Sequence, residues 1–246
     1  YNENITIQTT NASSDGIRFG QNGGTGTLAA TKTITIGAGG FIAGDLQFRN
    51  FTQTGNTSQS LVCTGLARIY NYDSNWGGDV SFIAPRNITR GTFYNRTAYL
   101  EKTGASDDQS IGGNTFSMDV DFVNSGSGYL MMGNGTFDTY SANVNLTNTG
   151  SRHMYFAYNG PGHSVSGNLT ATNSGSGTSG VYIGSGNTST LTINGNIALT
   201  QNGTGNTLYT YLGDQGDISA NGTVTLVNSG TGTTSEMRIA NNMNSA

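Results

Sequence analysis

The chain has 246 residues, of which Gly, Thr, Asn and Ser make up 127, and its formal net charge is −4. Ten basic residues in no cluster exclude nucleic-acid binding, and no apolar run approaches the roughly 20 residues of a membrane-spanning helix. A single cysteine, Cys63, excludes an intrachain disulfide framework and a cysteine-based zinc site. With 12 Tyr and 10 Phe among many Val, Ile and Thr, the composition indicates folded β-structure rather than disorder.

The first predicted elements lie in residues 1–40. The run Asn4-Ile5-Thr6 leads to Gly16-Ile17-Arg18-Phe19-Gly20 at the spacing with which Asn168 leads to Gly180-Val181. Alternation of apolar and polar residues is typical of half-buried strands. We therefore expect both ends of the chain to carry related regular units. Because it starts with Tyr1 and shows no signal peptide, we expect a processed or excised piece of a longer protein.

Residues 41–118 depart from the regular spacing. Strands are still indicated at 45–48, 66–70 and 79–83, with longer loops predicted at 71–78 and 104–113. We expect irregular coils here, and long loops are where a regular scaffold carries a site. The region also holds the one Trp, the one Cys and five of the eight Arg, namely Trp76, Cys63, Arg49, Arg68, Arg86, Arg90 and Arg96.

Residues 119–246 contain two short blocks that alternate along the chain. The first block occurs at 119–126, 143–150, 168–175, 196–203 and 223–230, and its leading apolar residues are 24, 25, 28 and 27 positions apart. The second block follows each first one, at 129–133, 153–157, 181–184, 208–213 and 237–240. A unit of this size with two or three short strands cannot bury its own apolar face, so neighbouring units must stack.

The repeats predict an all-β fold, a right-handed parallel β-solenoid with about 24–29 residues per coil. Helix is excluded because glycine, present 38 times, costs ~1 kcal/mol per position in a helix interior. We expect one continuous solenoid with regular coils at 1–40, irregular coils at 41–118 and regular coils at 119–246. Nine or ten coils stacked ~4.8 Å apart would make a rod of about 45 Å.

Stacking places equivalent residues of successive coils in columns. Two columns are predicted to point inward, and both are apolar: Val120, Val144, Leu169, Ile197 and Val224, then Phe122, Leu146, Ala171, Leu199 and Leu226. A third column is an asparagine ladder at a turn, with a structural role, because each amide can bond to the same amide one coil away. The ladder consists of Asn124, Asn148, Asn173, Asn202 and Asn228.

An outward column in the second block combines Met131 with Tyr155, Tyr182 and Tyr209, and Arg18 and Arg238 hold the equivalent place at the two ends. In one interpretation the tyrosines stack and stabilise neighbouring coils. In another they form a stripe that binds sugars or another filament. Ice binding is a third hypothesis, because Thr-x-Thr pairs occur at Thr33/Thr35, Thr170/Thr172, Thr190/Thr192 and Thr223/Thr225.

The repeats resemble a known family of proteins. Phe51-Thr52-Gln53-Thr54-Gly55, Leu100-Glu101-Lys102-Thr103-Gly104 and Val181-Tyr182-Ile183-Gly184 are similar to the Gly/Asn/Thr repeat arrays of giant surface proteins of Bacteroidota. Those proteins are exported by the type IX secretion system, and their relatives include the gliding-motility adhesins. The resemblance covers essentially the whole chain and implies a secreted, cell-surface stalk or filament, with no catalytic residue to carry over.

No catalytic, cofactor-binding or metal-binding residue is predicted from the sequence. The nearest candidate for a lyase-like site groups Asp73, Asp79, Arg86 and Arg90 around Trp76. Faint calcium candidates are Asp107-Asp108 and Asp119-x-Asp121, while His153 and His163 are interpreted as surface histidines.

The predicted function is therefore a non-catalytic structural segment of a secreted cell-surface adhesin, without a cofactor. Its expected partners are further copies of the same repeat, in the same chain or head-to-tail, and a surface polysaccharide. The alternative is a polysaccharide-binding or polysaccharide-degrading β-helix. The alternative requires a groove with converging carboxylates near residues 71–101.

Overall fold

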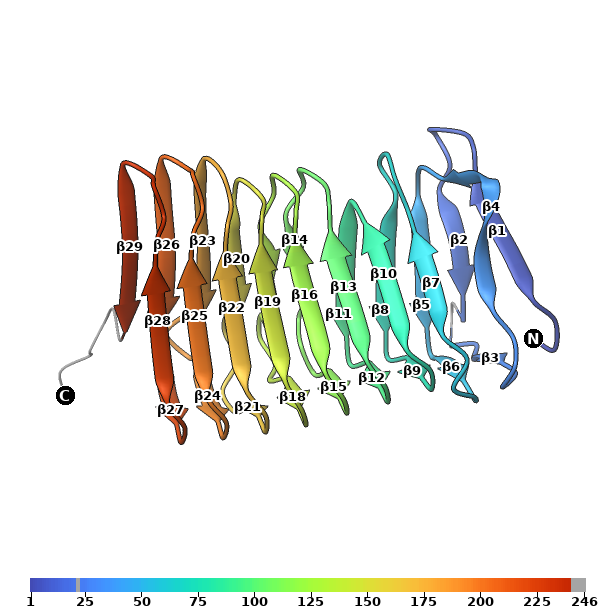
Figure 1. The fold of residues 1–246 in the computed structure, drawn as a ribbon. Helices are drawn as coiled ribbons and strands as arrows, with labels where there is room; N and C mark the ends of the chain where they lie inside the picture. The colour runs from blue at the N-terminus through green and yellow to red at the C-terminus, as the bar shows by residue number, and fades with distance from the viewer. Residues whose placement is uncertain (21–22, 240–246) are drawn as a thin grey trace.

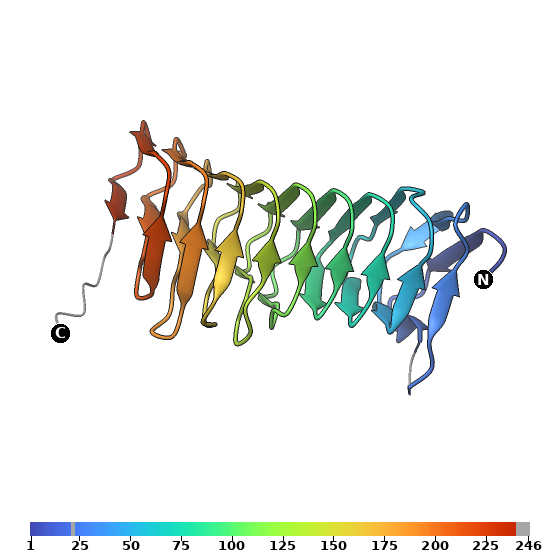
Figure 2. The same cartoon turned by 90° about the horizontal axis from the view of Figure 1, so that it is seen from below.

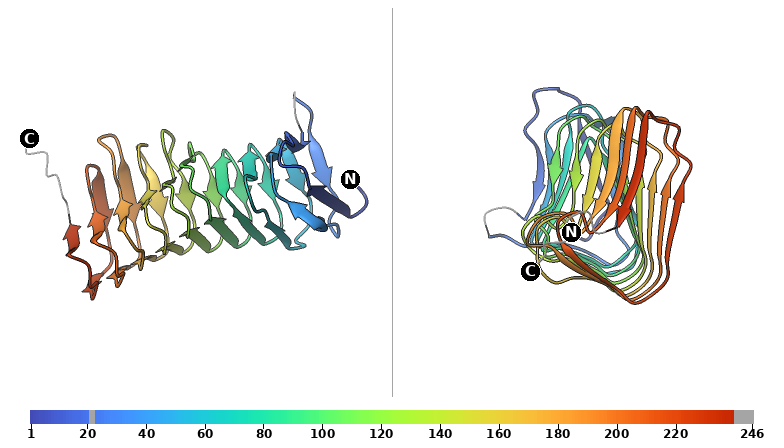
Figure 3. Two further views of the ribbon diagram at one scale, coloured as in Figure 1. Left: turned by 90° about the horizontal axis from the view of Figure 1, so that it is seen from above. Right: turned by 90° about the vertical axis from the view of Figure 1, so that its left-hand side faces the viewer.

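The computed structural model describes residues 1–20 and 23–239, and in that part of the chain every regular element is a β-strand. No described segment forms a helix long and apolar enough to cross a membrane. The strands wind into a right-handed rod of stacked coils (Figures 1 and 2). Each coil contributes one strand to each of three sides, and the end-on view in Figure 3 shows the coils superimposed around one core. The predicted parallel β-solenoid is confirmed.

The front side carries two sheets. It begins with the pair β1 (Ile5–Thr9) and β4 (Ile34–Phe41) and continues as eight parallel strands. These eight are β7 (Gln59–Val62), β10 (Val80–Ala84), β13 (Ala98–Lys102), β16 (Val120–Asn124), β19 (Val144–Asn148), β22 (Leu169–Asn173), β25 (Ile197–Gln201) and β28 (Val224–Asn228).

The base consists of nine short strands, one per coil, and they form one sheet. They are β3 (Gly26–Leu28), β6 (Phe51–Gln53), β9 (Asn75–Trp76), β12 (Phe93–Tyr94), β15 (Thr115–Phe116), β18 (Thr139–Tyr140), β21 (His163–Val165), β24 (Thr190–Ile193) and β27 (Asp217–Ala220).

The back side is divided into two sheets. The first contains β2 (Gly16–Phe19), β5 (Asp45–Arg49), β8 (Arg68–Tyr72) and β11 (Arg86–Arg90). The second contains β14 (Asp108–Gln109), β17 (Leu130–Met131), β20 (His153–Phe156), β23 (Thr178–Ile183), β26 (Thr207–Leu212) and β29 (Thr234–Ile239).

Coil length changes along the rod. The step along the chain from Val80 to its register partner Ala98 is much shorter than the step from Leu169 to its partner Ile197. The coils of residues 41–118 are therefore shorter than the others, and the prediction of longer loops there is wrong. The segment 71–78 is a tight corner that already contains β9, and 104–113 contains β14.

The two inward columns predicted from the repeats are in register from β16 to β28. Their members are buried up to β25, but Leu226 in β28 is 40% exposed, because no described strand covers that edge of the front sheet. Aromatic rings stack inside the base: Tyr94, Phe116 and Tyr140 have centroids 4.7 and 5.1 Å apart. Cys63 is buried, as expected of a small hydrophobic residue.

Candidate functional site

The inward polar column at the end of the front strands differs from the predicted asparagine ladder. Gln201, not Asn202, pairs with Asn173 and with Asn228, so including Asn202 was wrong. Strand alternation explains the shift, because Ile197 and Leu199 point inward and the next inward residue is two positions on. The register column contains Lys102, Asn124, Asn148, Asn173, Gln201 and Asn228.

None of these side chains bonds to another member of the column. Gln201 bonds to the hydroxyl groups of Thr210 and Ser235, and the other five donate to backbone carbonyls. The Asn148 amide donates to the carbonyl of Arg152 at 2.8 Å and to that of Gly180, in the next coil, at 3.0 Å. Each amide therefore fastens its own turn, and some also fasten the neighbouring coil. The column satisfies buried backbone groups that a thin core would leave unpaired.

A second polar ladder, at the corner before the front strands, was missed by the sequence analysis. The Oδ1 atom of Asn143 accepts the backbone N–H of Asn168 at 2.9 Å, and the Oδ1 atom of Asn168 accepts that of Asn196 at 2.9 Å. The same bond joins Asp119 to Asn143 and Asn196 to Thr223. The signal was available in the repeats, because an Asp or Asn precedes the leading apolar residue of four of the five copies.

The outward stripe on the back side also differs from the prediction. Tyr155 pairs with Met131 and Tyr182 as expected, but Tyr182 then pairs with Tyr211, which pairs with Arg238. Placing Tyr209 in this column was wrong, since Tyr209 lies beside it, opposite Gly180. Arg18 lies in the first back sheet, opposite Gln47.

The tyrosines pack against each other along the rod axis. The Tyr155 and Tyr182 rings are 5.0 Å apart and nearly parallel at 23°, and Tyr211 meets Tyr182 edge-on at 5.1 Å. Ring faces used in this way are not available to a sugar ring lying flat on the surface. The geometry favours the interpretation that the stripe stabilises neighbouring coils.

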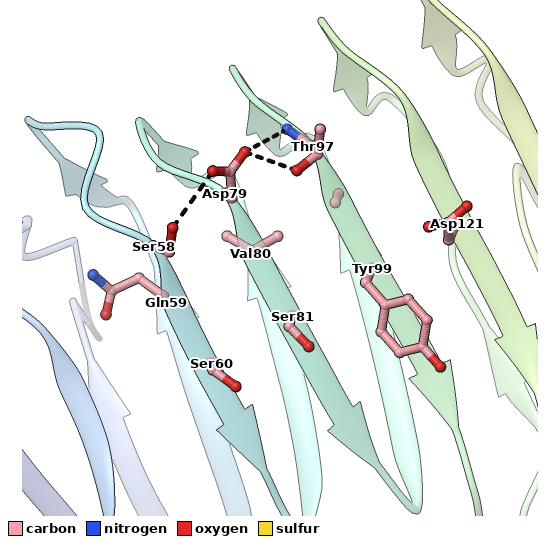
Figure 4. Close-up of a pocket in the computed structure, with 10 residues that line it drawn as sticks. Ser58, Gln59, Ser60, Asp79, Val80, Ser81, Thr97, Tyr99 and Asp121 are labelled. Atoms are coloured by element: carbon pink, nitrogen blue, oxygen red, sulfur yellow. Dashed lines mark hydrogen bonds between the residues drawn. The ribbon is translucent and has the colours of Figure 1, made fainter.

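The lyase-like cluster does not form. Trp76 is buried in the core, and Arg90 pairs with Asp73 at 3.2 Å on the back side. Arg86 instead pairs with buried Asp108 at 2.9 Å. Asp79 lies directly before the front strand β10 (Figure 4), so the four charged residues do not share a site.

Asp79 borders a shallow depression of about 260 Å³ on the front sheet, and Ser58, Ser60, Ser81 and Thr97 are among the residues that line it (Figure 4). Its carboxylate accepts bonds from the hydroxyl and backbone N–H of Thr97 and from Ser58. The Thr97 hydroxyl bond is the main reason that the pKa of Asp79 is below its usual value. Asp121, at the far side, accepts a bond from Asn145 at 2.8 Å, so the two carboxylates are engaged separately.

The residues of the metal-binding and ice-binding hypotheses do not lie together in the structure. Within the described ranges no three His, Cys, Asp or Glu side chains are grouped as metal ligands. Asp108 is buried against Arg86, whereas Asp107 is exposed. The Thr-x-Thr pairs lie on different sides, for example Thr170/Thr172 in β22 on the front and Thr190/Thr192 in β24 on the base.

A basic and aromatic surface on the first back sheet is the strongest candidate binding site. Tyr72 lies between Arg49 and Arg90 in one register column, and their guanidinium carbons are 5.4 and 4.9 Å from its ring centroid. In a parallel column, Arg68 lies between Arg86 and Asp45. Arg68 forms an ion pair with Asp45 at 2.7 Å. We call the outward side chains of Arg49, Arg68, Tyr70, Tyr72, Arg86 and Arg90 the Arg–Tyr face.

A groove borders the Arg–Tyr face at the corner between front and back. It has a volume of about 450 Å³ and is lined by Arg68 and Arg86 together with the apolar side chains of Leu66 and Pro85. The concentration of arginine at 41–118 is visible in the sequence, but the repeats of 119–246 do not indicate that these arginines share one side. Aligning this region at its own, shorter coil length would have brought these arginines into register.

The prediction of a surface histidine is wrong for His163, whereas His153 lies on the outward side of β20. His163 is buried in the base with Asp138, and its Nδ1 accepts the backbone N–H of Asp138 at 3.0 Å. The Asp138 carboxylate accepts bonds from Asn114 and from the Tyr140 hydroxyl. Burial raises the pKa of Asp138 to about 6 and lowers the pKa of His163 to about 4. Burial also lowers the pKa of His153, which is half-buried, to about 4.

We expect Asp138→Asn to make the protein more sensitive to acid. His163 titrates near 6.5 when unfolded, so its contribution to stability is lost as the pH falls from 6.5 through 4. Asp138 has the opposite effect, because its raised pKa favours the folded state increasingly as the pH falls from 6 to 3.8. As the pH falls from 6 to 3.8, the free energy of unfolding of Asp138→Asn should therefore decrease by about 3 kcal/mol more than that of the wild type.

Urea unfolding followed by circular dichroism at several pH values measures this difference. The double variant Asp138→Asn/His163→Gln is the control, and its profile should flatten again. Parallel pH profiles for the wild type and Asp138→Asn would contradict the assignment of Asp138 as a buried group protonated near pH 6.

No protein-family model, no curated protein and no solved structure matches this chain.

Proposed function

We propose that the chain is a non-catalytic structural segment, a stalk or filament piece, of a secreted cell-surface adhesin. The observation that carries the proposal is the continuity of the front sheet from β7 to β28, eight strands joined in parallel register. The polar side chains at the corner before the front strands form hydrogen bonds between coils, such as those from Asp119 to Asn143 and from Asn143 to Asn168. A rod of this kind holds a binding site at a distance from the cell.

We further propose that the rod continues into more coils, in the same chain or by head-to-tail stacking of copies. The edge formed by β28 and β29 supports this, because the inward residues Leu226 and Ile239 are 40% and 55% exposed there. An uncovered edge presents unpaired backbone groups that another strand can join. The strand pairs near residues 5–19 and 169–183 have the same spacing along the chain, so coils at the two ends of the rod have matching dimensions for such a contact.

Deleting one whole coil tests the structural proposal. Removal of residues 144–168 would join Asn143 to Leu169, which takes the place of its register partner Val144. If the protein is a modular rod, we expect this variant to fold cooperatively, with a rod shortened by about 4.8 Å. Its control removes residues 144–156, about half a coil, and should not fold.

Circular dichroism melting and electron microscopy distinguish the two variants. A whole-coil deletion that is as unfolded as the half-coil deletion would contradict a modular rod. Measurable turnover of a polysaccharide that Asp79→Ala abolishes would overturn the non-catalytic role.

The Arg–Tyr face favours a second function, the binding of an acidic polysaccharide. Arginines recognise carboxylate and sulfate groups through paired hydrogen bonds, and Arg49 has no carboxylate within ion-pairing distance in the described structure. Arg49 and Arg90 lie two coils apart in one column, about 9.6 Å along the rod. A polysaccharide chain lying parallel to the axis would present acidic groups to both.

A polyuronate and an uncharged polysaccharide of similar length, compared by isothermal titration calorimetry, test this function. We expect binding of the polyuronate alone, weakened at least tenfold in Arg49→Gln/Arg90→Gln. Arg96→Gln is the matched control, because Arg96 is exposed but lies outside the Arg–Tyr face. Equal affinity in all three proteins would eliminate this site.

A further inference from the structure

The groove at the corner between front and back is built by three successive coils. Its lining residues lie in the segments 65–68, 85–86 and 104–106, which precede or begin β8, β11 and β14. Because equivalent positions of stacked coils repeat every 4.8 Å or so (~4.8 Å) along the rod, the groove runs parallel to the rod axis. Its volume of about 450 Å³ is in the range of sites that bind small molecules.

Two arginines of adjacent coils line this groove. Arg68 and Arg86 are register partners, so their guanidinium groups repeat at the spacing of the strands. Arg68 uses Nε for its ion pair with Asp45 at 2.7 Å. Arg86 likewise uses Nε for its ion pair with Asp108 at 2.9 Å. Within the described ranges the Nη groups of both arginines make no hydrogen bond, so they remain for a ligand.

The internal ion pairs prepare the two arginines for binding. A pair through Nε fixes the plane of the guanidinium group, so less side-chain freedom is lost when an anion binds to the Nη groups. The side chains of Arg68 and Arg86 are 39% and 27% exposed, and both can be reached from solvent. Two neighbouring anionic groups, one for each arginine, are the matching ligand chemistry.

The groove also has an exposed apolar side. Leu66 is 76% exposed, the highest value among the large apolar side chains of the described residues. An exposed leucine beside two arginines fits a ligand that has anionic groups and an apolar face. A uronic acid has both, because its carboxylate lies at the edge of the sugar ring and its C–H bonds form an apolar face.

The groove is separate from the register column of Arg49, Tyr72 and Arg90, which we call the Arg49 column. Arg68 and Tyr72 are the first and last residues of β8, and about 13 Å of extended strand separates them. A polysaccharide chain that lies over the Arg49 column parallel to the axis leaves the groove uncovered, because a sugar ring is narrower than this distance.

We propose that the groove is a second site for an acidic polysaccharide, so that the rod holds two polysaccharide chains side by side. Carboxylates of consecutive uronic acid residues bind Arg68 and Arg86, because one residue of an extended chain is about as long as the strand spacing. Leu66 contacts the apolar face of a sugar ring. The inference rests on the proposed binding of an acidic polysaccharide and adds a site that requires adjacent carboxylates.

Calorimetric titration with trigalacturonate tests the proposal. We expect two sites in the wild type and one in Arg49→Gln/Arg90→Gln, where only the groove is left. The groove should be the weaker site, because Arg68 and Arg86 already have carboxylate partners. Trigalacturonate methyl-esterified on its middle residue should lose the groove but keep the Arg49 column, since Arg49 and Arg90 are two coils apart.

Two variants made in the Arg49→Gln/Arg90→Gln protein identify the groove. Arg68→Gln should weaken the remaining binding of trigalacturonate at least tenfold. Leu66→Asp should do the same through repulsion between like charges, and it should leave the melting temperature unchanged because Leu66 is exposed. The second variant keeps Asp45 paired with Arg68, so its effect does not depend on the loss of that ion pair.

Two outcomes would overturn the second site. The first is no binding of trigalacturonate by Arg49→Gln/Arg90→Gln, and the proposed function remains in place if the wild type still binds one molecule. The second is binding by this protein that neither Arg68→Gln nor Leu66→Asp weakens. Binding by the wild type that Arg68→Gln abolishes and Arg49→Gln/Arg90→Gln leaves unchanged would support the groove and reject the Arg49 column.

Discussion

Val144→Asp is expected to abolish cooperative folding of the coils around β19. Val144 is fully buried between Val120 and Leu169 in an inward column that is apolar from Val80 onward. An aspartate there would be an unpaired charge in a thin core, and we expect a loss of more than about 4 kcal/mol. Thermal melting followed by circular dichroism measures the loss.

Two further variants set the scale for this result. Thr147→Asp places the same charge on the outward side of the same strand and should change stability by less than about 1 kcal/mol. Leu226→Asp should also cost much less than Val144→Asp, because Leu226 is 40% exposed at the edge of the front sheet. A melting temperature of Val144→Asp within ~1 °C of the wild type would contradict the inward assignment.

Trp76→Ala is the second large effect, expected at about 3 to 5 kcal/mol. Trp76 fills the core of the short coils, with its ring 4.9 Å from Phe48, 5.1 Å from Phe51 and 5.0 Å from Phe82. Its indole N–H donates to Asn71 Oδ1 at 3.1 Å, so the substitution leaves a buried polar atom as well as a cavity.

Chemical denaturation measures the loss, and Phe93→Ala is its matched control. Phe93 is an aromatic residue of the next base strand that points outward, so its removal should cost less than about 1 kcal/mol. Similar losses for both variants would show that Trp76 does not hold the short coils together.

The repeats predicted the architecture because spacing and alternation are local properties. Columns such as Val120, Val144 and Leu169 could be read directly, since each copy starts with the same polar-apolar alternation. Residues were assigned to the wrong column where a repeat block can be aligned with its neighbour in two ways. Tyr209 and Tyr211 both follow the pattern, and only the alignment of Gly213 with Gly184, both left-handed with φ of 74° and 63°, selects Tyr211.

The candidate site could not be predicted in the same way. The Arg–Tyr face lies in coils that are shorter than the repeats of 119–246, where no repeat motif marks which arginines align. The burial of His163 and its contact with Asp138 depend on the path of the base strands, since polar residues in single short strands give no signal of direction.

Sedimentation of the chain over a range of concentrations is the most direct test of the central claim, that the chain is a rod segment extended by stacking at its edges. We expect end-to-end oligomers that grow with concentration, and Leu226→Lys, which places a charge on the exposed edge at β28, should keep the protein smaller without unfolding it. A wild-type protein that stays monomeric and cooperatively folded at every concentration would contradict the account.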